Sequence, residues 1–337
     1  MTDLKPALFL LDYQTMPLEE IYDGEAMRRL EARLDLLPGV FTAADLAAAP
    51  ERFRDVRVAL STWGMPALSE ADLEQRLPRL EAVFYAAGSV QEFARPLLAR
   101  GIRLSSAWAA NAVPVAEFTV AQILLAGKGY HQSLRRTKQD YRASREYSMT
   151  FPGNYGIKVG ILGAGQIDTL VIELLKRHEL EILVFDPFLD EARAAALGVR
   201  KCGLDEIFST CLTVSNHLAN KPETRGLLNG ALFDRMLPNA TFLNTGRGAQ
   251  VVEEDLFRAL EAEPGRTAIL DVTDPEPPVD MDRFRALDNV LLTPHIAGSM
   301  NQECRRMGLF MTEEVERYLD GAPLRWEVTP ERLATMA

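Results

Sequence analysis

The sequence has 337 residues, of which 47% are apolar and 25% are charged, the composition of an ordinary globular protein. A net charge of −11 without blocks of like charge argues against nucleic-acid binding through a basic surface. No apolar run approaches the roughly eighteen residues of a membrane span, and the first thirty residues lack the pattern of a secretory leader. A chain of this length is expected to form two domains.

Three cysteines, Cys202, Cys211 and Cys304, are few, odd in number and without the spacing of metal ligands. We interpret them as free thiols with packing roles, as in the reducing cytoplasm. The sequence therefore predicts a cytoplasmic protein without a metal site and without a membrane partner.

The first third of the chain alternates short apolar runs with helical stretches. This alternation predicts a small parallel α/β domain. Residues 115–129 are apolar nearly all round and end at a glycine, which predicts a buried helix linking two domains. The expected strands are residues 7–12, 56–63, 80–88 and 102–108.

From residue 158 onward, the strand candidates are continuous apolar runs. Strands of this kind are buried on both faces, as in a doubly wound parallel sheet. Between the first two, apolar residues at three- and four-residue spacing predict a helix with one face against the sheet. Residues 301–320 predict a last amphipathic helix that can return to the N-terminal domain. The expected strands are residues 158–163, 181–186, 212–217, 240–245, 268–272 and 289–293.

The first of these strands runs into a glycine turn, G-A-G-Q-I-D, at residues 163–168. Gly163 and Gly165 allow a tight turn whose backbone amides can approach a pyrophosphate at a helix N-terminus. Asp186 ends the next strand, where a carboxylate can bind the adenosine ribose hydroxyls and disfavours NADP relative to NAD. The alternative is a helix-starting loop with an exposed aspartate.

Asp168 stands where the third glycine of the fingerprint is usual. Helical spacing places it at the margin of the apolar stripe, beside Val171 and Leu175, where its side chain should widen the helix–strand contact. A carboxylate in the first turn favours the helix dipole but competes with the cofactor's phosphates. We expect weaker cofactor binding, with loss of binding as the alternative.

Three segments near the ends of the last strands carry a resemblance: N-T-G-R-G at 244–248, D-V-T-D-P-E-P-P at 271–278 and T-P-H-I-A-G-S at 293–299. In this order, after a nucleotide-binding fold, they resemble the NAD-dependent D-2-hydroxyacid dehydrogenase family. The usual motifs of that family are close to I-N-x-x-R-G, D-V-F-x-x-E-P and T-P-H-I-x-G. The segments at 86–90 and 217–229 resemble further loops of the family.

The resemblance implies a two-domain α/β fold. Residues 114–305 would form a central Rossmann domain with a doubly wound parallel sheet. Residues 1–113 and 306–337 would form a smaller, discontinuous, flavodoxin-like α/β substrate domain. The family also implies a homodimer joined through the nucleotide domains, with residues 115–150 contributing.

The chemistry of the family explains why its motifs carry an arginine, a glutamate and a histidine. A 2-keto acid that accepts a hydride needs its carbonyl polarised, its carboxylate held and its alkoxide protonated. The resemblance implies that Arg247 does the first two, through a planar charged fork. It implies that His295 donates the proton in reduction and that Glu276 orients the imidazole and stabilises its protonated form. The alternatives are that Arg247 forms a surface salt bridge, that Glu276 is merely solvated and that His295 is a structural histidine.

The resemblance also implies which residues contact NAD, with Asp271 at the nicotinamide carboxamide. His217 is interpreted as structural or cofactor-lining rather than as an acid or base. The implied cofactor contacts are Gly163, Gly165, Gln166, Ile167, Asp186, His217, Leu218, Thr245, Gly246, Arg247, Asp271, His295 and Gly298.

The substrate would lie in the interdomain cleft, bound by both domains. The resemblance implies that the backbone amides of Gly88 and Ser89 receive its carboxylate, together with Arg247 and His295, and that Asn111 faces the cleft. Trp63 is interpreted equally as pocket wall or as core packing. Where some members have an arginine for a second acidic group, no basic residue occurs, which favours a monocarboxylic 2-hydroxy or 2-keto acid.

Three further residues depart from the family wording. Thr273 stands where phenylalanine is usual, Gly246 replaces a small alkyl residue, and Asn216 interrupts an apolar strand end. None removes a reacting group. Asn216 and Asp168 both fall in the nucleotide domain, so we expect them to bear on cofactor affinity rather than on the catalytic arrangement. A non-catalytic dinucleotide-sensing protein and an adenosyl-cofactor methyltransferase are the alternatives, and neither explains the Arg–Glu–His order.

Overall fold

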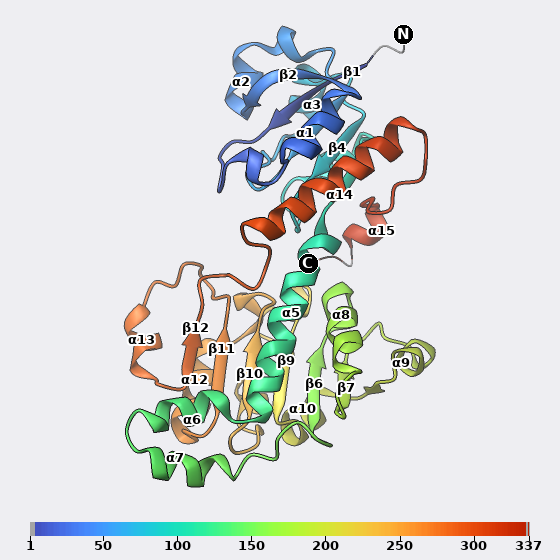
Figure 1. Cartoon of the computed structure of the whole chain (residues 1–337). Coiled ribbons are helices and arrows are strands. Elements are labelled where there is room, and N and C mark those ends of the chain that lie inside the picture. Colours follow the sequence, from blue (N-terminus) through green and yellow to red (C-terminus); the bar gives the residue numbers. More distant parts are fainter. Residues whose placement is uncertain (1–3, 335, 337) are drawn as a thin grey trace. The chain divides into compact units, whose positions relative to one another are not determined.

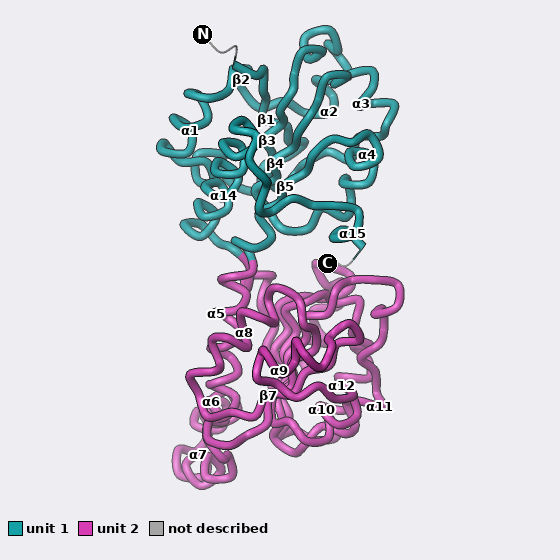
Figure 2. Tube along the Cα trace, turned by 90° about the vertical axis from the view of Figure 1, so that its right-hand side faces the viewer, with its two compact units in different colours: residues 1–111, 299–337 teal, residues 112–298 magenta. Residues whose placement is uncertain are grey.

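The computed structural model describes residues 4–334 and residue 336 (Figure 1). The chain divides into two compact units: unit 1 runs to Asn111 and resumes at Ser299, and unit 2 is Ala112–Gly298 (Figure 2). The sequence predicts these boundaries after residues 113 and 305, whereas both come earlier in the structure. The second boundary comes earlier because the Ser299 amide donates to the Asn111 side chain at 2.9 Å, which joins the start of the last segment to unit 1.

Unit 1 contains a five-stranded, all-parallel sheet in the order β2-β1-β3-β4-β5, the flavodoxin-like order expected from the resemblance. The edge strand β2 escaped prediction because it carries Pro38 and Gly39 and is largely exposed, which breaks the apolar pattern. The strands are β1 (Lys5–Leu10), β2 (Leu34–Phe41), β3 (Val58–Ser61), β4 (Ala82–Tyr85) and β5 (Arg103–Ser106).

Helices cover both faces of this sheet, and successive residues of β1 alternate between two apolar cores, Leu8 in one and Phe9 in the other. The expected last helix is α14, which packs with α1 on the Phe9 side. The α-helices are α1 (Gly24–Glu31), α2 (Ala43–Ala48), α3 (Glu70–Arg76), α4 (Ala94–Ala99), α14 (Gln302–Leu319) and α15 (Pro330–Leu333), with 3-10 turns η1 (Leu18–Glu20) and η2 (Pro50–Phe53).

Unit 2 contains a seven-stranded parallel sheet in the order β12-β11-β10-β9-β6-β7-β8. All six predicted strands are present, and the doubly wound Rossmann prediction is confirmed. The additional strand β8 is too short to show a pattern. The strands are β6 (Lys158–Leu162), β7 (Glu181–Phe185), β8 (Arg200–Lys201), β9 (Thr213–Asn216), β10 (Thr241–Asn244), β11 (Thr267–Leu270) and β12 (Val290–Leu292).

Two apolar cores again flank the sheet, with Ile161 in one and Leu162 in the other. Sequence signals set the helix ends, as in α9, which begins at the N-cap Asp190 and ends at Gly198 in the left-handed conformation. The helices are α5 (Trp108–Gly127), α6 (Tyr130–Thr137), α7 (Tyr141–Ser148), α8 (Gln166–Leu175), α9 (Glu191–Leu197), α10 (Leu204–Thr210), α11 (Gly230–Phe233), α12 (Glu253–Ala262) and α13 (Met281–Ala286), with η3 (Pro222–Thr224) and η4 (Gly248–Gln250).

The helix expected to link the domains is α5, which begins in unit 1 and continues into unit 2 (Figure 2). Among the residues that the structure describes, α5 alone is long and apolar enough to cross a membrane. Half of its span is buried, and Ala116 and Ile123 belong to a core of unit 2. A buried core helix explains this composition.

Candidate active site

The glycine turn after β6 is closed by two carboxylates. The Ala164 amide donates to Oδ2 of Asp186 and the Gly165 amide donates to Oδ2 of Asp168, both at 2.8 Å. Gly163 has a φ of 124°, and a Cβ atom there would lie only 2.7 Å from Asp168 Oδ2. A glycine is therefore required at position 163 both by the backbone and by the aspartate.

Asp168 lies beside Val171 and Leu175 on the buried face of α8, as predicted, but within that face rather than at its margin, because it is only 2% exposed. It turns back over the first turn of α8 and caps the Gly165 amide instead of extending along the helix. Burial raises the pKa of Asp168 to about 8, against the opposing effect of the Gly165 hydrogen bond. Within the described chain, Oδ1 has no hydrogen-bond partner. Near neutral pH this carboxyl group is therefore largely uncharged.

The surroundings of the turn suit a dinucleotide. Asp186 follows β7, and its Oδ1 accepts the Phe188 amide at 2.6 Å. Arg193 of α9 donates to the Ala164 carbonyl at 2.6 Å, which fixes the turn from the other side. Gln166, at the start of α8, is exposed. A glycine turn, a helix N-terminus and a carboxylate after the next strand are the parts that bind pyrophosphate and ribose in this fold.

His217 follows β9, and its buried ring lies between two hydroxyl groups. Its ring nitrogens are 2.8 Å from Ser215 Oγ and 2.9 Å from Thr245 Oγ1. Burial lowers the pKa of His217 to about 3, so the ring is neutral near pH 7. This geometry agrees with the structural or cofactor-lining interpretation of His217. Through Thr245, the ring contacts the residue that follows β10.

His295 and Glu276 form a close pair. Nδ1 of His295 lies 2.6 Å from Oε1 of Glu276, and both side chains are partly exposed, at 45% and 39%. The His295 backbone has a φ of 54°, a conformation that non-glycine residues adopt mostly where the surrounding structure enforces it. The bond through Nδ1 leaves Nε2 as the ring nitrogen that can exchange a proton with a substrate.

Asp271 holds the turn that carries His295. Its buried carboxylate accepts hydrogen bonds from Thr293 Oγ1 at 2.6 Å and from the amides of Ile296 and Ala297 at 2.8 and 2.9 Å. The His295 amide itself donates to the Asp271 carbonyl at 3.0 Å. The resemblance predicts a contact of Asp271 with the nicotinamide carboxamide and does not predict this role. The signal in the sequence is an aspartate at the end of one strand and T-P-H-I at the end of the next.

Arg247 follows β10 in a turn that packs on the Glu276 loop. A Cβ atom on Gly248 would lie 2.0 Å from the Thr273 carbonyl carbon, so only glycine permits this contact. Burial lowers the pKa of the Arg247 guanidinium, and the Glu276 charge opposes that effect. Nη1 donates to the Gly246 carbonyl at 2.7 Å, and within the described residues the other guanidinium nitrogens have no partner. Unit 2 thus gathers a desolvated cation and an imidazole–carboxylate pair.

The predicted substrate-binding residues outside this cluster lie in unit 1. Ser106 Oγ donates to the Gly88 carbonyl at 2.6 Å, and a Cβ atom on Gly88 would lie 3.4 Å from Asn111 Nδ2. The Gly88–Ser89 loop and Asn111 are therefore neighbours. Trp63 is partly buried and packs against both cores of unit 1, which favours its core-packing interpretation.

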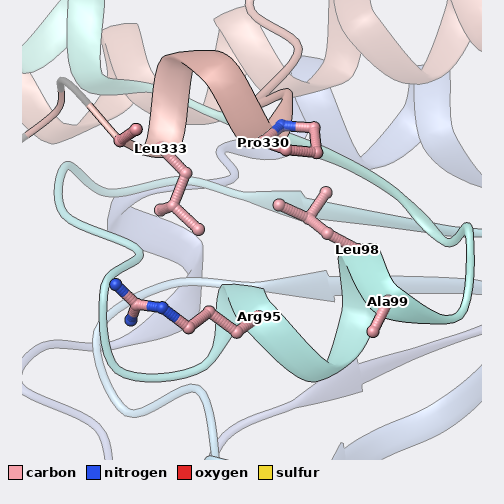
Figure 3. Close-up of a pocket in the computed structure, with 6 residues that line it drawn as sticks. Arg95, Leu98, Ala99, Pro330 and Leu333 are labelled. Atoms are coloured by element: carbon pink, nitrogen blue, oxygen red, sulfur yellow. The ribbon is translucent and has the colours of Figure 1, made fainter.

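A surface hollow of about 360 Å³ lies between α4 and α15 in unit 1 (Figure 3). Arg95 is the one charged residue that lines it, beside apolar side chains such as Leu98 and Leu333. None of the predicted site residues belongs to it. Within the described chain, no three His, Cys, Asp or Glu side chains are placed to hold a metal ion.

Comparison with known proteins decides the family. Residues 120–297 match the family profile described as "D-isomer specific 2-hydroxyacid dehydrogenase, NAD binding domain". This chain belongs to the D-isomer-specific 2-hydroxyacid dehydrogenase family. The sequence is similar to D-3-phosphoglycerate dehydrogenase of Archaeoglobus fulgidus, with 30% identity over 226 residues. That match covers 67% of this chain but only 42% of the relative's length.

Solved structures of the 2-hydroxyacid dehydrogenase fold resemble nearly the whole chain. D-mandelate dehydrogenase of Rhodotorula graminis, in its holo form, has a TM-score of 0.79 at 19% identity and covers 97% of this chain and 98% of its own. A phosphoglycerate oxidoreductase of Rhizobium etli has a TM-score of 0.80 at 20% identity, with 97% and 99% covered. At these identities, the structures establish the shared two-domain fold.

Proposed function

We propose that this protein is an NAD-dependent oxidoreductase that interconverts a small 2-keto acid and its D-2-hydroxy acid. The observation that carries the proposal is the His295–Glu276 pair at 2.6 Å, on an NAD-binding domain that also presents Arg247. A protein that only senses dinucleotides needs no proton donor. The paired imidazole therefore favours catalysis over sensing.

When bound, NADH would supply a hydride to the substrate C2 in reduction, and NAD⁺ would accept one from it in oxidation. His295 protonates the developing alkoxide during reduction and removes that proton during oxidation, while Glu276 fixes the ring through Nδ1. Arg247, with free guanidinium N–H groups in a desolvated setting, binds the carboxylate and polarises the adjacent carbonyl. Proton transfer and charge stabilisation thus come from separate side chains.

The residues of the glycine turn would hold the cofactor's pyrophosphate at the N-terminus of α8, and Asp186 would accept the ribose hydroxyls. One amide of this turn, that of Gly165, already donates its hydrogen bond to Asp168. A protonated Asp168 can release this amide without leaving a buried charge beside a phosphate, and its own O–H can donate to that phosphate. NAD is favoured over NADP because of Asp186.

A monocarboxylic substrate fits the residues of unit 1. The loops that follow β1, β3 and β4, residues 11–17, 62–69 and 86–93, contain no Lys or Arg. A phosphate or second carboxylate on the substrate would need such a cation. We therefore propose an apolar or neutral side chain on the 2-keto acid, in contrast to the phosphorylated compounds in the names of some relatives.

We propose a cytoplasmic homodimer joined through the nucleotide domains. The hairpin of α6 and α7 in unit 2 exposes apolar side chains, with Tyr141 74%, Met149 72%, Leu134 46% and Tyr130 45% exposed. Covering such a surface with a second copy removes apolar area from water. Light scattering that gives the mass of one chain at micromolar concentration would contradict this assembly.

The test of the function is a panel of 2-keto acids assayed for NADH oxidation. Pyruvate, 2-ketoisocaproate, phenylpyruvate and benzoylformate are expected to include substrates, whereas phosphohydroxypyruvate and oxaloacetate are expected to react slowly. NADH binding is measured in parallel by fluorescence. Binding of NADH without turnover of any 2-keto acid would favour the sensing alternative, and turnover of phosphohydroxypyruvate alone would overturn the proposed substrate class.

A further inference from the structure

Three buried amide side chains form a closed cluster at the ends of β9 and β10. Asn216, Asn244 and Gln250 are each at most 1% exposed. The Asn216 Nδ2 group donates to Asn244 Oδ1 at 3.0 Å and to Gln250 Oε1 at 2.6 Å. Burying three amides is costly unless every polar atom is paired, so the pattern of partners shows what the cluster holds.

The partners belong chiefly to the turn that carries Arg247. Asn244 Nδ2 donates to the Arg247 carbonyl at 3.2 Å, and Gln250 Oε1 accepts the Arg247 amide at 3.3 Å. Asn244 Oδ1 also accepts the Gly246 amide at 3.0 Å, and Gln250 Nε2 donates to the Leu218 carbonyl. The backbone of Arg247 is therefore held at both its N–H and its C=O.

The absence of a side chain at Gly246 belongs to the same arrangement. A Cβ atom there would lie 2.9 Å from Gln250 Oε1 and 3.1 Å from Asn216 Nδ2. The first distance is shorter than real Cβ atoms show and the second is tighter than most of their contacts, so even an alanine would press against the two amides. Asn216 and Gly246, which look like unrelated departures in the sequence, are thus parts of one packed unit with Gln250.

We propose that Asn216 and Gln250 are positioning residues for the reaction. Gln250 accepts the Arg247 amide, and Asn216 holds Gln250 and Asn244 against the Arg247 turn, so that the guanidinium is held where the substrate carboxylate binds. This inference rests on the proposed function of Arg247. The two amides touch neither substrate nor cofactor in this role and act only through Arg247. Apolar side chains of similar volume would fill the space, but they would leave the Arg247 amide without its Gln250 partner and Asn244 without the bond from Asn216.

A double-mutant cycle tests this role. The paired replacement Asn216→Leu with Gln250→Leu removes both amides and the bond between them, while Asn244 keeps its bonds to the Arg247 carbonyl and the Gly246 amide. It is combined with Arg247→Ala. In the native background, kcat/KM for the 2-keto acid is expected to fall about 30-fold, as for a catalytic group displaced by a fraction of an ångström. NADH affinity should change less than about twofold. In the Arg247→Ala background the paired replacement should have no further effect, because its path to the substrate is already gone.

The control is Asn289→Leu, which removes a buried amide of the same unit that donates to the Leu260 and Arg266 carbonyls. This variant is expected to lose stability while keeping its KM for the 2-keto acid. If the paired replacement lowers kcat/KM equally with and without Arg247, or acts through NADH affinity, the positioning role is overturned.

Hydrogen–deuterium exchange separates this inference from the proposed function. A peptide covering residues 244–250 should exchange faster in the paired variant, while residues 267–270 of β11 should keep their protection. Unchanged exchange at 244–250 would overturn the inference whatever the enzyme's activity. If the native protein reduces no 2-keto acid but the exchange changes as expected, the proposed function fails and the holding of the Arg247 turn stands.

Discussion

Raising the pH from 7 to 9 is expected to weaken NADH binding about tenfold, and Asp168→Asn is expected to abolish this dependence. The reason lies in the glycine turn, where the buried Asp168 takes the Gly165 amide that a pyrophosphate needs. An ionised Asp168 keeps that amide and repels the phosphates. A protonated Asp168 releases it and presents an O–H donor.

The magnitude follows from the pKa of Asp168, about 8: burial, and to a smaller extent the nearby Asp186 charge, raise this pKa, while the Gly165 hydrogen bond and Arg193 lower it. If only the protonated form binds, the competent fraction falls from about 0.9 at pH 7 to about 0.1 at pH 9. The apparent Kd rises in inverse proportion to that fraction. The amide introduced by Asp168→Asn is uncharged at both pH values, so the Kd of that variant should stay nearly constant.

The assay is a fluorescence titration of NADH between pH 6.5 and 9.5. Glu191→Gln, which neutralises an exposed carboxylate at the start of α9, serves as the matched charge control and should keep the native pH profile. A native Kd that does not change up to pH 9, or an Asp168→Asn variant that follows the native profile, would refute the reasoning.

Four further outcomes are expected. His295→Ala should lower kcat by a factor of about 10²–10⁴ with NADH affinity retained, since it removes only the proton donor, as single-turnover kinetics would show. Arg247→Lys should lower kcat/KM about 100-fold because a point charge replaces a planar fork; a change below threefold in steady-state assays would contradict its role. Gly248→Ala should lower the free energy of unfolding, measured by urea denaturation, by about 2 kcal/mol, because its Cβ would meet the Thr273 backbone. Gly203→Ala, with open space around the new methyl group, should lower it far less. Asp168→Asn should be more stable than the native protein at pH 8.5 and lose that advantage toward pH 4, as urea denaturation at the two pH values would show. The folded pKa of about 8 exceeds the ordinary 3.8, so ionisation of the native group lowers the free energy of unfolding progressively between these values, by up to about 6 kcal/mol.

The sequence predicted the architecture well because buried parallel strands are continuous apolar runs. Each of the six strands expected in unit 2 is present, and their carboxyl ends carry the glycine turn, Asp186 and His217. The two strands that escaped prediction lie at sheet edges, where burial on both faces is not required. The pattern of apolar residues reflects burial, so it does not predict an element that is short or exposed.

The sequence predicted the residue types of the candidate site but not the orientations of their side chains. Glu276 and His295 lie 19 positions apart in sequence, yet their motifs predicted a pair, and the structure places the two side chains 2.6 Å apart. The helical wheel could not show that Asp168 turns back on its own helix, because a wheel gives the Cα direction and not the side-chain rotamer. For the same reason, the shared packing of Asn216 and Gly246 emerged only with the tertiary structure.

The central claim is that His295, Glu276 and Arg247 serve hydride transfer between NADH and C2 of a 2-keto acid. Its most direct test is to incubate the protein with NADH deuterated at C4 of the nicotinamide and with the fastest 2-keto acid of the panel, and to analyse the product by mass spectrometry and chiral chromatography. We expect a D-2-hydroxy acid with deuterium at C2, formed by the native protein and nearly absent with His295→Ala. Bound NADH with no deuterium in any 2-hydroxy acid product would contradict it.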